Sequence, residues 1–81
     1  MKKVLRFTAS WCGPCKMLAK NLESIKTDLE IQVVDIDTDT AMAQKYGIRG
    51  VPTLIMLDGD KEVKRNVGVG SLKDLQTWFE K

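Results

Sequence analysis

An apolar stripe with the spacing of a helix lies between two apolar runs that are typical of strands. The run KKVLRFTA predicts a strand near residues 3–8, and IQVVDID predicts a second strand at residues 31–36. The segment between them predicts a helix over residues 14–27, because its apolar residues recur every three or four positions. A strand, a helix and a strand of this length predict a βαβ unit with parallel strands and a right-handed crossover. The stripe consists of Cys15, Leu18, Leu22, Ile25 and Leu29.

The second half of the sequence predicts a short helix, a β-hairpin and a final helix. The segment DTDTAMAQKYG predicts a helix over about residues 39–46, ended by its glycine. An Asp-Gly pair predicts a tight turn between strands at about 53–57 and 61–67. The last segment, SLKDLQTWFEK, predicts a helix that its first serine caps. We therefore expect the order β-α-β-α-β-β-α in a single α/β domain spanning residues 1–81.

The charge and hydropathy patterns argue against several classes of function. The net charge is +2, and Lys and Arg are interspersed with Asp and Glu, which argues against binding to nucleic acid or an anionic membrane. No apolar run approaches the ~18 residues of a transmembrane helix, and the basic start MKKVLRF is too short for a signal peptide. We expect a monomer in the cytoplasm or another reducing compartment, where a purely structural disulfide seldom persists.

The only two cysteines, Cys12 and Cys15, lie in the motif SWCGPCK, between the first predicted strand and the first predicted helix. Cys15 is in phase with the apolar stripe, so we expect it to point inward. Cys12 precedes the first helical turn, where unpaired N–H groups and the helix dipole favour a thiolate. We expect Cys12 to be exposed, with the lowered pKa that a nucleophilic cysteine needs. A thiolate attacks a disulfide to give a mixed disulfide, which a second nearby thiol resolves.

Other roles for the cysteine pair are possible in principle. A structural disulfide closing so short a loop would restrict the unfolded chain little. A metal site would need more ligands than one C-x-x-C supplies, and the absence of histidine excludes a Cys-His dyad and a His-containing zinc site within one chain. Two inert core cysteines are a third alternative. We favour redox chemistry, with no metal and no cofactor, because C-x-x-C beside a βαβ unit is typical of it.

Several motifs resemble the thioredoxin family over nearly the whole chain. They are WCGPCK, VDIDTD, KYGIRGVPT at residues 45–53, and the VGVG before the last helix. The resemblance implies a minimal thioredoxin fold, with a four-stranded mixed sheet ordered 2-1-3-4 and helices on both faces. The chain lacks the family's first strand and helix and is similar in length to the small glutaredoxins.

The resemblance also implies roles for individual residues. Cys12 would attack, Cys15 would resolve, and Pro52 matches the family's cis-proline, which packs against the disulfide. Such a proline would leave the Val51 backbone free to pair with an extended substrate segment. An ordinary strand-entry proline and ordinary strand-end valines are the alternatives. The residues that match the family's partner-binding rim are Trp11, Gly13, Pro14, Gly50, Val51, Val67, Gly68 and Val69.

The function that the resemblance implies is reduction of protein disulfides through a dithiol–disulfide cycle. A thioredoxin reductase, or glutathione, would restore the dithiol. One alternative is glutaredoxin-like, glutathione-dependent reduction, which the length permits and the Gly-Pro dipeptide disfavours. Another is a non-catalytic subunit of a larger enzyme, with the cysteines incidental.

The sequence departs from the family six residues before the first cysteine. The family carries a buried aspartate there that helps to deprotonate the second cysteine, and this chain has Arg6. An arginine does not accept a proton at neutral pH, but a guanidinium near the site would favour a thiolate. Asp35 is expected on the same face of the sheet and is the candidate ion-pair partner of Arg6. The alternative is that Arg6 reaches the surface.

Overall fold

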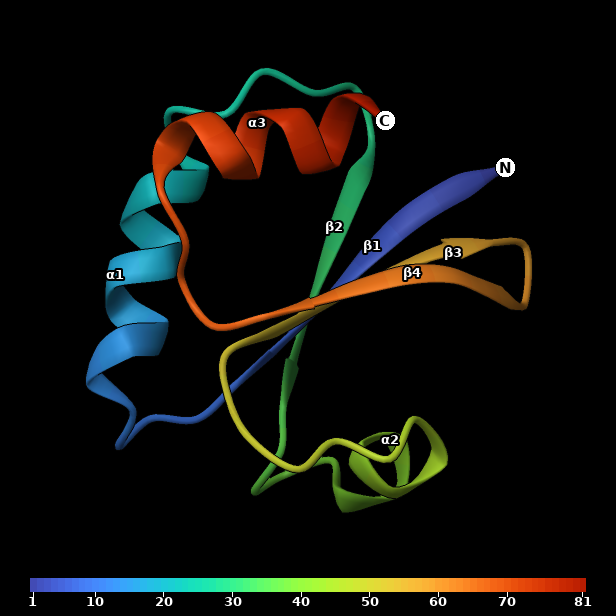
Figure 1. Cartoon of the computed structure of the whole chain (residues 1–81). Coiled ribbons are helices and arrows are strands. Elements are labelled where there is room, and N and C mark those ends of the chain that lie inside the picture. The colour runs from blue at the N-terminus through green and yellow to red at the C-terminus, as the bar shows by residue number, and fades with distance from the viewer.

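The computed structural model describes residues 1–81 as a four-stranded sheet with helices on both faces (Figure 1). The strand order β2-β1-β3-β4 and the element order β-α-β-α-β-β-α both confirm the expected fold. Strand β1 is parallel to β2 and antiparallel to β3, which is in turn antiparallel to β4. The elements are β1 (Lys2–Thr8), α1 (Gly13–Leu22), β2 (Glu30–Asp35), α2 (Thr40–Lys45), β3 (Thr53–Asp58), β4 (Lys61–Val67) and α3 (Leu72–Glu80).

The core consists of two apolar layers, one on each face of the sheet. Helices α1 and α3 cover one face and α2 covers the other (Figure 1). Successive residues of β1 and β3 point to opposite faces, so each central strand contributes to both layers. The α1/α3 layer is formed by Val4, Leu18, Leu54, Met56, Leu75 and Phe79. The α2 layer is formed by Leu5, Phe7, Val34, Ile55 and Leu57.

Helix α1 is shorter than the predicted range of residues 14–27, because it ends at Leu22. The next three backbone N–H groups donate to carbonyls three residues back instead of four. This is the tighter 3₁₀ pattern, and it ends the α-helix. The side-chain amide of Gln76 on α3 then makes two hydrogen bonds of 3.0 Å to the backbone of Lys26. Its Oε1 accepts from the Lys26 N–H, and its Nε2 donates to the Lys26 carbonyl. These contacts replace the bonds of a further helical turn. Ile25 and Leu29 still pack against the α1/α3 layer from outside the helix.

The two other helices lie within one residue of their predicted ranges. Asp39 caps α2 by accepting a hydrogen bond from the Met42 N–H at 3.2 Å. Ser71 caps α3 by accepting a hydrogen bond from the Asp74 N–H at 3.1 Å. Such caps satisfy donors that the first helical turn leaves unpaired. None of the helices has the length and apolar character that crossing a membrane requires.

Candidate active site

Cys12 and Cys15 form a disulfide at the start of α1. Cys12 is the N-cap residue, and its Sγ accepts a hydrogen bond from the Cys15 N–H at 3.1 Å. Pro14 occupies the first helical turn, where a missing N–H leaves no bond unmade. The Cys12 sulfur therefore lies where the unpaired N–H groups and the dipole of α1 stabilise negative charge.

Both cysteines are buried in this disulfide form. Cys15 is 1% exposed, as its place in the apolar stripe predicts. Cys12 is only 4% exposed, so the expectation that it is exposed is wrong. The reason is packing around the disulfide: Ala9, Ile36 and Val51 surround it, and the Cys12 Sγ lies 3.8 Å from the Val51 carbonyl oxygen. A reacting sulfur must therefore approach along the small exposed part of Cys12.

The segment that faces the disulfide contains a cis peptide bond between Val51 and Pro52. Two hydrogen bonds hold this segment in place: the Thr53 hydroxyl donates to the Gly50 carbonyl at 2.8 Å, and the Gly68 N–H donates to the Pro52 carbonyl at 3.0 Å. Pro52 itself is buried. The Val51 N–H makes no hydrogen bond within the chain, so it is available to a partner.

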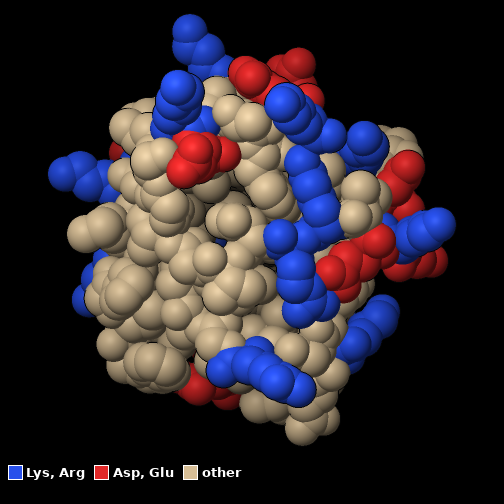
Figure 2. Space-filling model, viewed as in Figure 1, with Lys and Arg blue, Asp and Glu red and all other residues tan.

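Exposed uncharged residues lie on part of the surface beside the disulfide. Trp11 and Val67 are 68% and 69% exposed. Figure 2 shows that the surface over α1 and the segment leading into α3 is mostly uncharged, with charged side chains gathered toward the β3–β4 side. The other residues that match the family's rim are exposed or half-buried: Gly13, Pro14, Gly50, Val51, Gly68 and Val69.

Asp37 is a residue that the sequence analysis did not assign to this site. Its Oδ2 accepts a hydrogen bond from the Trp11 Nε1 at 2.8 Å. Parallel β1 and β2 end at the same edge of the sheet, which brings the residues after each strand together. Asp37 directly follows the second predicted strand, so its position near the cysteine motif could have been predicted from the sequence.

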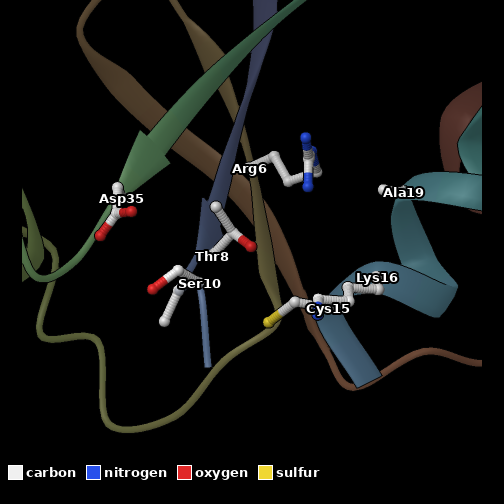
Figure 3. Close-up of a pocket in the computed structure, with 8 residues that line it drawn as sticks. Arg6, Thr8, Ser10, Cys15, Lys16, Ala19 and Asp35 are labelled. Atoms are coloured by element: carbon white, nitrogen blue, oxygen red, sulfur yellow. The ribbon is translucent and has the colours of Figure 1, made fainter. Parts of the chain in front are cut away.

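A cavity of about 230 Å³ lies behind Cys15 (Figure 3). The side chain of Arg6 reaches from β1 toward Ala19 on α1 and is half-buried. Burial lowers the pKa of the Arg6 guanidinium below its ordinary value, because desolvation disfavours the charged form. The polar and charged side chains that line the cavity are Arg6, Thr8, Ser10, Lys16 and Asp35.

The expected ion pair between Arg6 and Asp35 is not formed, and that expectation is wrong. In the β1–β2 ladder Arg6 is opposite Val33, whereas Asp35 is opposite Thr8, two pairs nearer the strand ends. Figure 3 shows the Asp35 carboxyl on the other side of Thr8 from the Arg6 guanidinium. The Asp35 carboxyl instead accepts a hydrogen bond from the Asp37 N–H at 2.8 Å.

A dithiol that closes to a disulfide at a helix N-terminus exchanges disulfides by attack of one sulfur on another. No group of three or more His, Cys, Asp or Glu side chains is placed to hold a metal ion. The fold and the cysteine pair thus define a thiol–disulfide oxidoreductase.

Comparison with known proteins identifies the family. A protein-family model of thioredoxin matches residues 1–81. The chain is 44% identical over 69 residues to a thioredoxin of Chlamydia trachomatis, which covers 82% of this chain and 68% of that protein. It is 42% identical over 66 residues to a bifunctional thioredoxin reductase/thioredoxin of Mycobacterium leprae, which covers 76% of this chain and 14% of that protein.

Among solved structures, the N21Q mutant thioredoxin from Halobacterium salinarum superimposes with a TM-score of 0.88 and 36% identity, over 98% of this chain and 72% of that one. The chain belongs to the thioredoxin family.

Proposed function

We propose that this protein reduces disulfides in protein substrates, with Cys12 as the attacking and Cys15 as the resolving cysteine. The observation that carries the proposal is the position of the Cys12 Sγ, which caps α1 and accepts the Cys15 N–H at 3.1 Å. In the reduced protein the same N–H and the helix dipole would stabilise a Cys12 thiolate at neutral pH. Cys15 is the more deeply buried of the two, which suits a thiol that reacts only within the protein.

The proposed cycle has two exchange steps. The Cys12 thiolate attacks one sulfur of the substrate disulfide; a Cys12–substrate bond forms and the other substrate sulfur leaves as a thiolate. The Cys15 thiolate then attacks the Cys12 Sγ and releases the second substrate sulfur. The substrate gains two electrons, and the protein is left with the Cys12–Cys15 disulfide that the structure contains.

Substrate binding is proposed along the cis Val51-Pro52 segment and the surrounding rim. The unpaired Val51 N–H would bond to an extended substrate segment, as in strand addition to a sheet edge. The exposed side chains of Trp11 and Val67 would contact apolar groups beside the substrate disulfide. This arrangement would deliver the substrate sulfur to the exposed part of Cys12.

We further propose that a thioredoxin reductase supplies the electrons to a monomeric, single-domain protein in the cytoplasm. The similarity to the Mycobacterium leprae protein supports this donor. That protein is named a bifunctional thioredoxin reductase/thioredoxin, which places both in one chain. The single sheet and its two apolar layers support one folding unit over residues 1–81.

The test is reduction of insulin by the purified protein, followed by turbidity. One reaction contains thioredoxin reductase and NADPH, and a parallel reaction contains glutathione, glutathione reductase and NADPH. We expect turnover with the first donor and little with the second. Activity with glutathione alone would instead support the glutaredoxin-like alternative. A variant with both cysteines replaced by serine is the control, and undiminished activity in it would overturn the proposal.

A further inference from the structure

Arg6 is a half-buried cation without a partner in the disulfide form. It takes part in neither of the two ion pairs of the molecule, and its guanidinium donates no hydrogen bond to another residue. A charge withdrawn from water without a counter-charge destabilises the folded state. The same burial lowers the pKa of the Arg6 guanidinium, because desolvation disfavours its charged form.

The position of Arg6 relates it to Cys15. Arg6 and Cys15 line the same cavity, and the Arg6 side chain reaches toward Ala19 (Figure 3). Ala19 lies four residues after Cys15 on α1, so the two share one face of the helix at a Cβ separation of about 5–6 Å. The guanidinium and the Cys15 side chain thus border the same cavity, from β1 and α1 respectively.

We propose that Arg6 is the counter-ion of the thiolate that Cys15 forms on reduction, and that it promotes the resolving step by keeping this sulfur ionised. This inference rests on the proposed function and assigns a role to one further residue of that site. Arg6 is a positioning residue, because it acts through Cys15 and contacts no substrate. The disulfide form leaves the guanidinium without an anion, and ionisation of Cys15 would place one in the cavity that both residues line.

The resolving step requires no general base in the protein. Cys15 loses its proton to solvent through the cavity, which is lined by the exposed side chains of Ser10 and Lys16. The thiolate then attacks the Cys12 Sγ of the mixed disulfide. The Cys12–Cys15 bond forms, the Cys12–substrate bond breaks, and the substrate sulfur leaves with the electron pair and takes a proton from water.

The other charged groups near Cys15 have weaker or opposing effects. Lys16 of α1 is exposed, so solvent screens its charge. Asp35 of β2 opposes ionisation, but it lies beyond Thr8 and accepts the Asp37 N–H. Glu23 lines a second cavity beside Arg6 and is exposed. The Val51-Pro52 segment brings no titratable side chain.

The decisive experiment is a pH titration of both cysteines in the reduced protein, read from the ¹³Cβ chemical shifts of labelled cysteine by NMR. In Arg6→Gln we expect the Cys15 midpoint to rise by about one pH unit or more and the Cys12 midpoint to move less. Arg6→Lys keeps the charge and should restore most of the shift. Lys73→Gln, an equal change of charge at an exposed site on α3, should move neither midpoint. Equal Cys15 midpoints in wild type and Arg6→Gln would overturn the inference, as would a Lys variant that behaves like the Gln variant.

A second measurement reports the same ion pair through the redox equilibrium with dithiothreitol. The pair exists only where Cys15 is ionised, so Arg6→Gln should disfavour reduction of the disulfide several-fold at pH 9 and leave it unchanged at pH 6. A difference that is the same at both pH values would contradict a role through ionisation.

A further pair of variants leaves Arg6 in place and is available if replacement of Arg6 prevents folding. Ala19→Glu puts a carboxylate near both the guanidinium and Cys15, so neutralisation of Arg6 and direct repulsion should both raise the Cys15 midpoint relative to Ala19→Gln; equal midpoints in this pair would overturn the inference. The insulin assay on the wild-type protein separates the two proposals. Inactive wild type would overturn the proposed function, whereas active wild type with equal midpoints would overturn only the role of Arg6.

Discussion

The indole Nε1 of Trp11 donates a hydrogen bond of 2.8 Å to the Oδ2 of Asp37. Trp11 immediately precedes the cysteine pair, and Asp37 follows the end of β2. The indole is 68% exposed, so packing alone does not hold it. This bond fixes the orientation of a large apolar side chain at the rim of the disulfide, and an ordered side chain loses less entropy when a partner binds.

Replacing Asp37 with alanine is expected to raise KM for protein substrates. The freed indole would have to be ordered on binding, so we expect KM for insulin to rise about threefold to tenfold, corresponding to roughly 0.5–1.5 kcal/mol for an immobilised side chain. Reduction of a small aromatic disulfide, which does not span the rim, should change little. Steady-state kinetics with both substrates make the comparison. Asp60→Ala, at the exposed hairpin turn, is the matched control, and an unchanged KM for insulin in Asp37→Ala would contradict the role given to this bond.

The sequence was sufficient for the order of elements and for the position of the cysteines, because these depend on short-range patterns. The apolar stripe placed Cys15 inward, and the Asp-Gly pair marked the hairpin, whose Gly59 adopts a φ of 63°. A serine at the start of an amphipathic segment was enough to locate the cap of α3. Each of these features is decided within a few residues of the chain.

The features that were missed depend on contacts between distant segments. The end of α1 is determined by Gln76, which lies 50 residues further along the chain. Arg6 and Asp35 do not form an ion pair because of the β1–β2 register and the direction of the Arg6 side chain. Alternation along a strand predicts which face of the sheet a residue lies on, but not which side chains on that face make contact. The burial of Cys12 depends on Val51, which packs onto it from the segment before β3.

Replacing Gln76 with alanine is expected to destabilise the protein by about 1–3 kcal/mol, because two hydrogen bonds to the Lys26 backbone are lost at roughly 0.5–1.5 kcal/mol each. The neighbouring residue offers a control, since the Thr77 hydroxyl makes no hydrogen bond and is exposed. Urea denaturation of the disulfide form gives the free energy of unfolding of both variants. If Gln76→Ala proves no less stable than Thr77→Ala, the amide does not brace the end of α1.

The Glu62–Arg65 pair is expected to make a small contribution to stability that disappears in acid. Two hydrogen bonds of 2.6 and 2.7 Å from Arg65 lower the pKa of the Glu62 carboxyl below its ordinary value. A carboxyl whose pKa is lower when folded stabilises the protein above its unfolded-state pKa, and that contribution is lost as the pH falls through the folded-state pKa. Both side chains are about one third exposed, so solvent screening keeps the contribution below about 1 kcal/mol.

The measurement for this pair is the difference in urea midpoint between wild type and Glu62→Gln. We expect wild type to be slightly more stable at pH 7, and the difference to shrink toward zero as the pH falls below about 4. Salt should reduce the difference at pH 7, because the pair is partly exposed. A difference that grows on acidification would show that the pair does not act through the ionised carboxyl.

Replacing Cys15 with serine is expected to stop the cycle after the first exchange step. The Cys12 thiolate would still attack, because its helix N-terminus is unchanged, but no second sulfur would be present to release the substrate. The mixed disulfide with a protein substrate should accumulate and appear in intact-mass spectra under non-reducing conditions, and dithiothreitol should remove it. Cys12→Ser is the matched variant and should form little adduct, because Cys15 is 1% exposed and lacks the N-cap position. Adducts that form equally in the two variants would show that either sulfur can attack, and would overturn the division of roles between them.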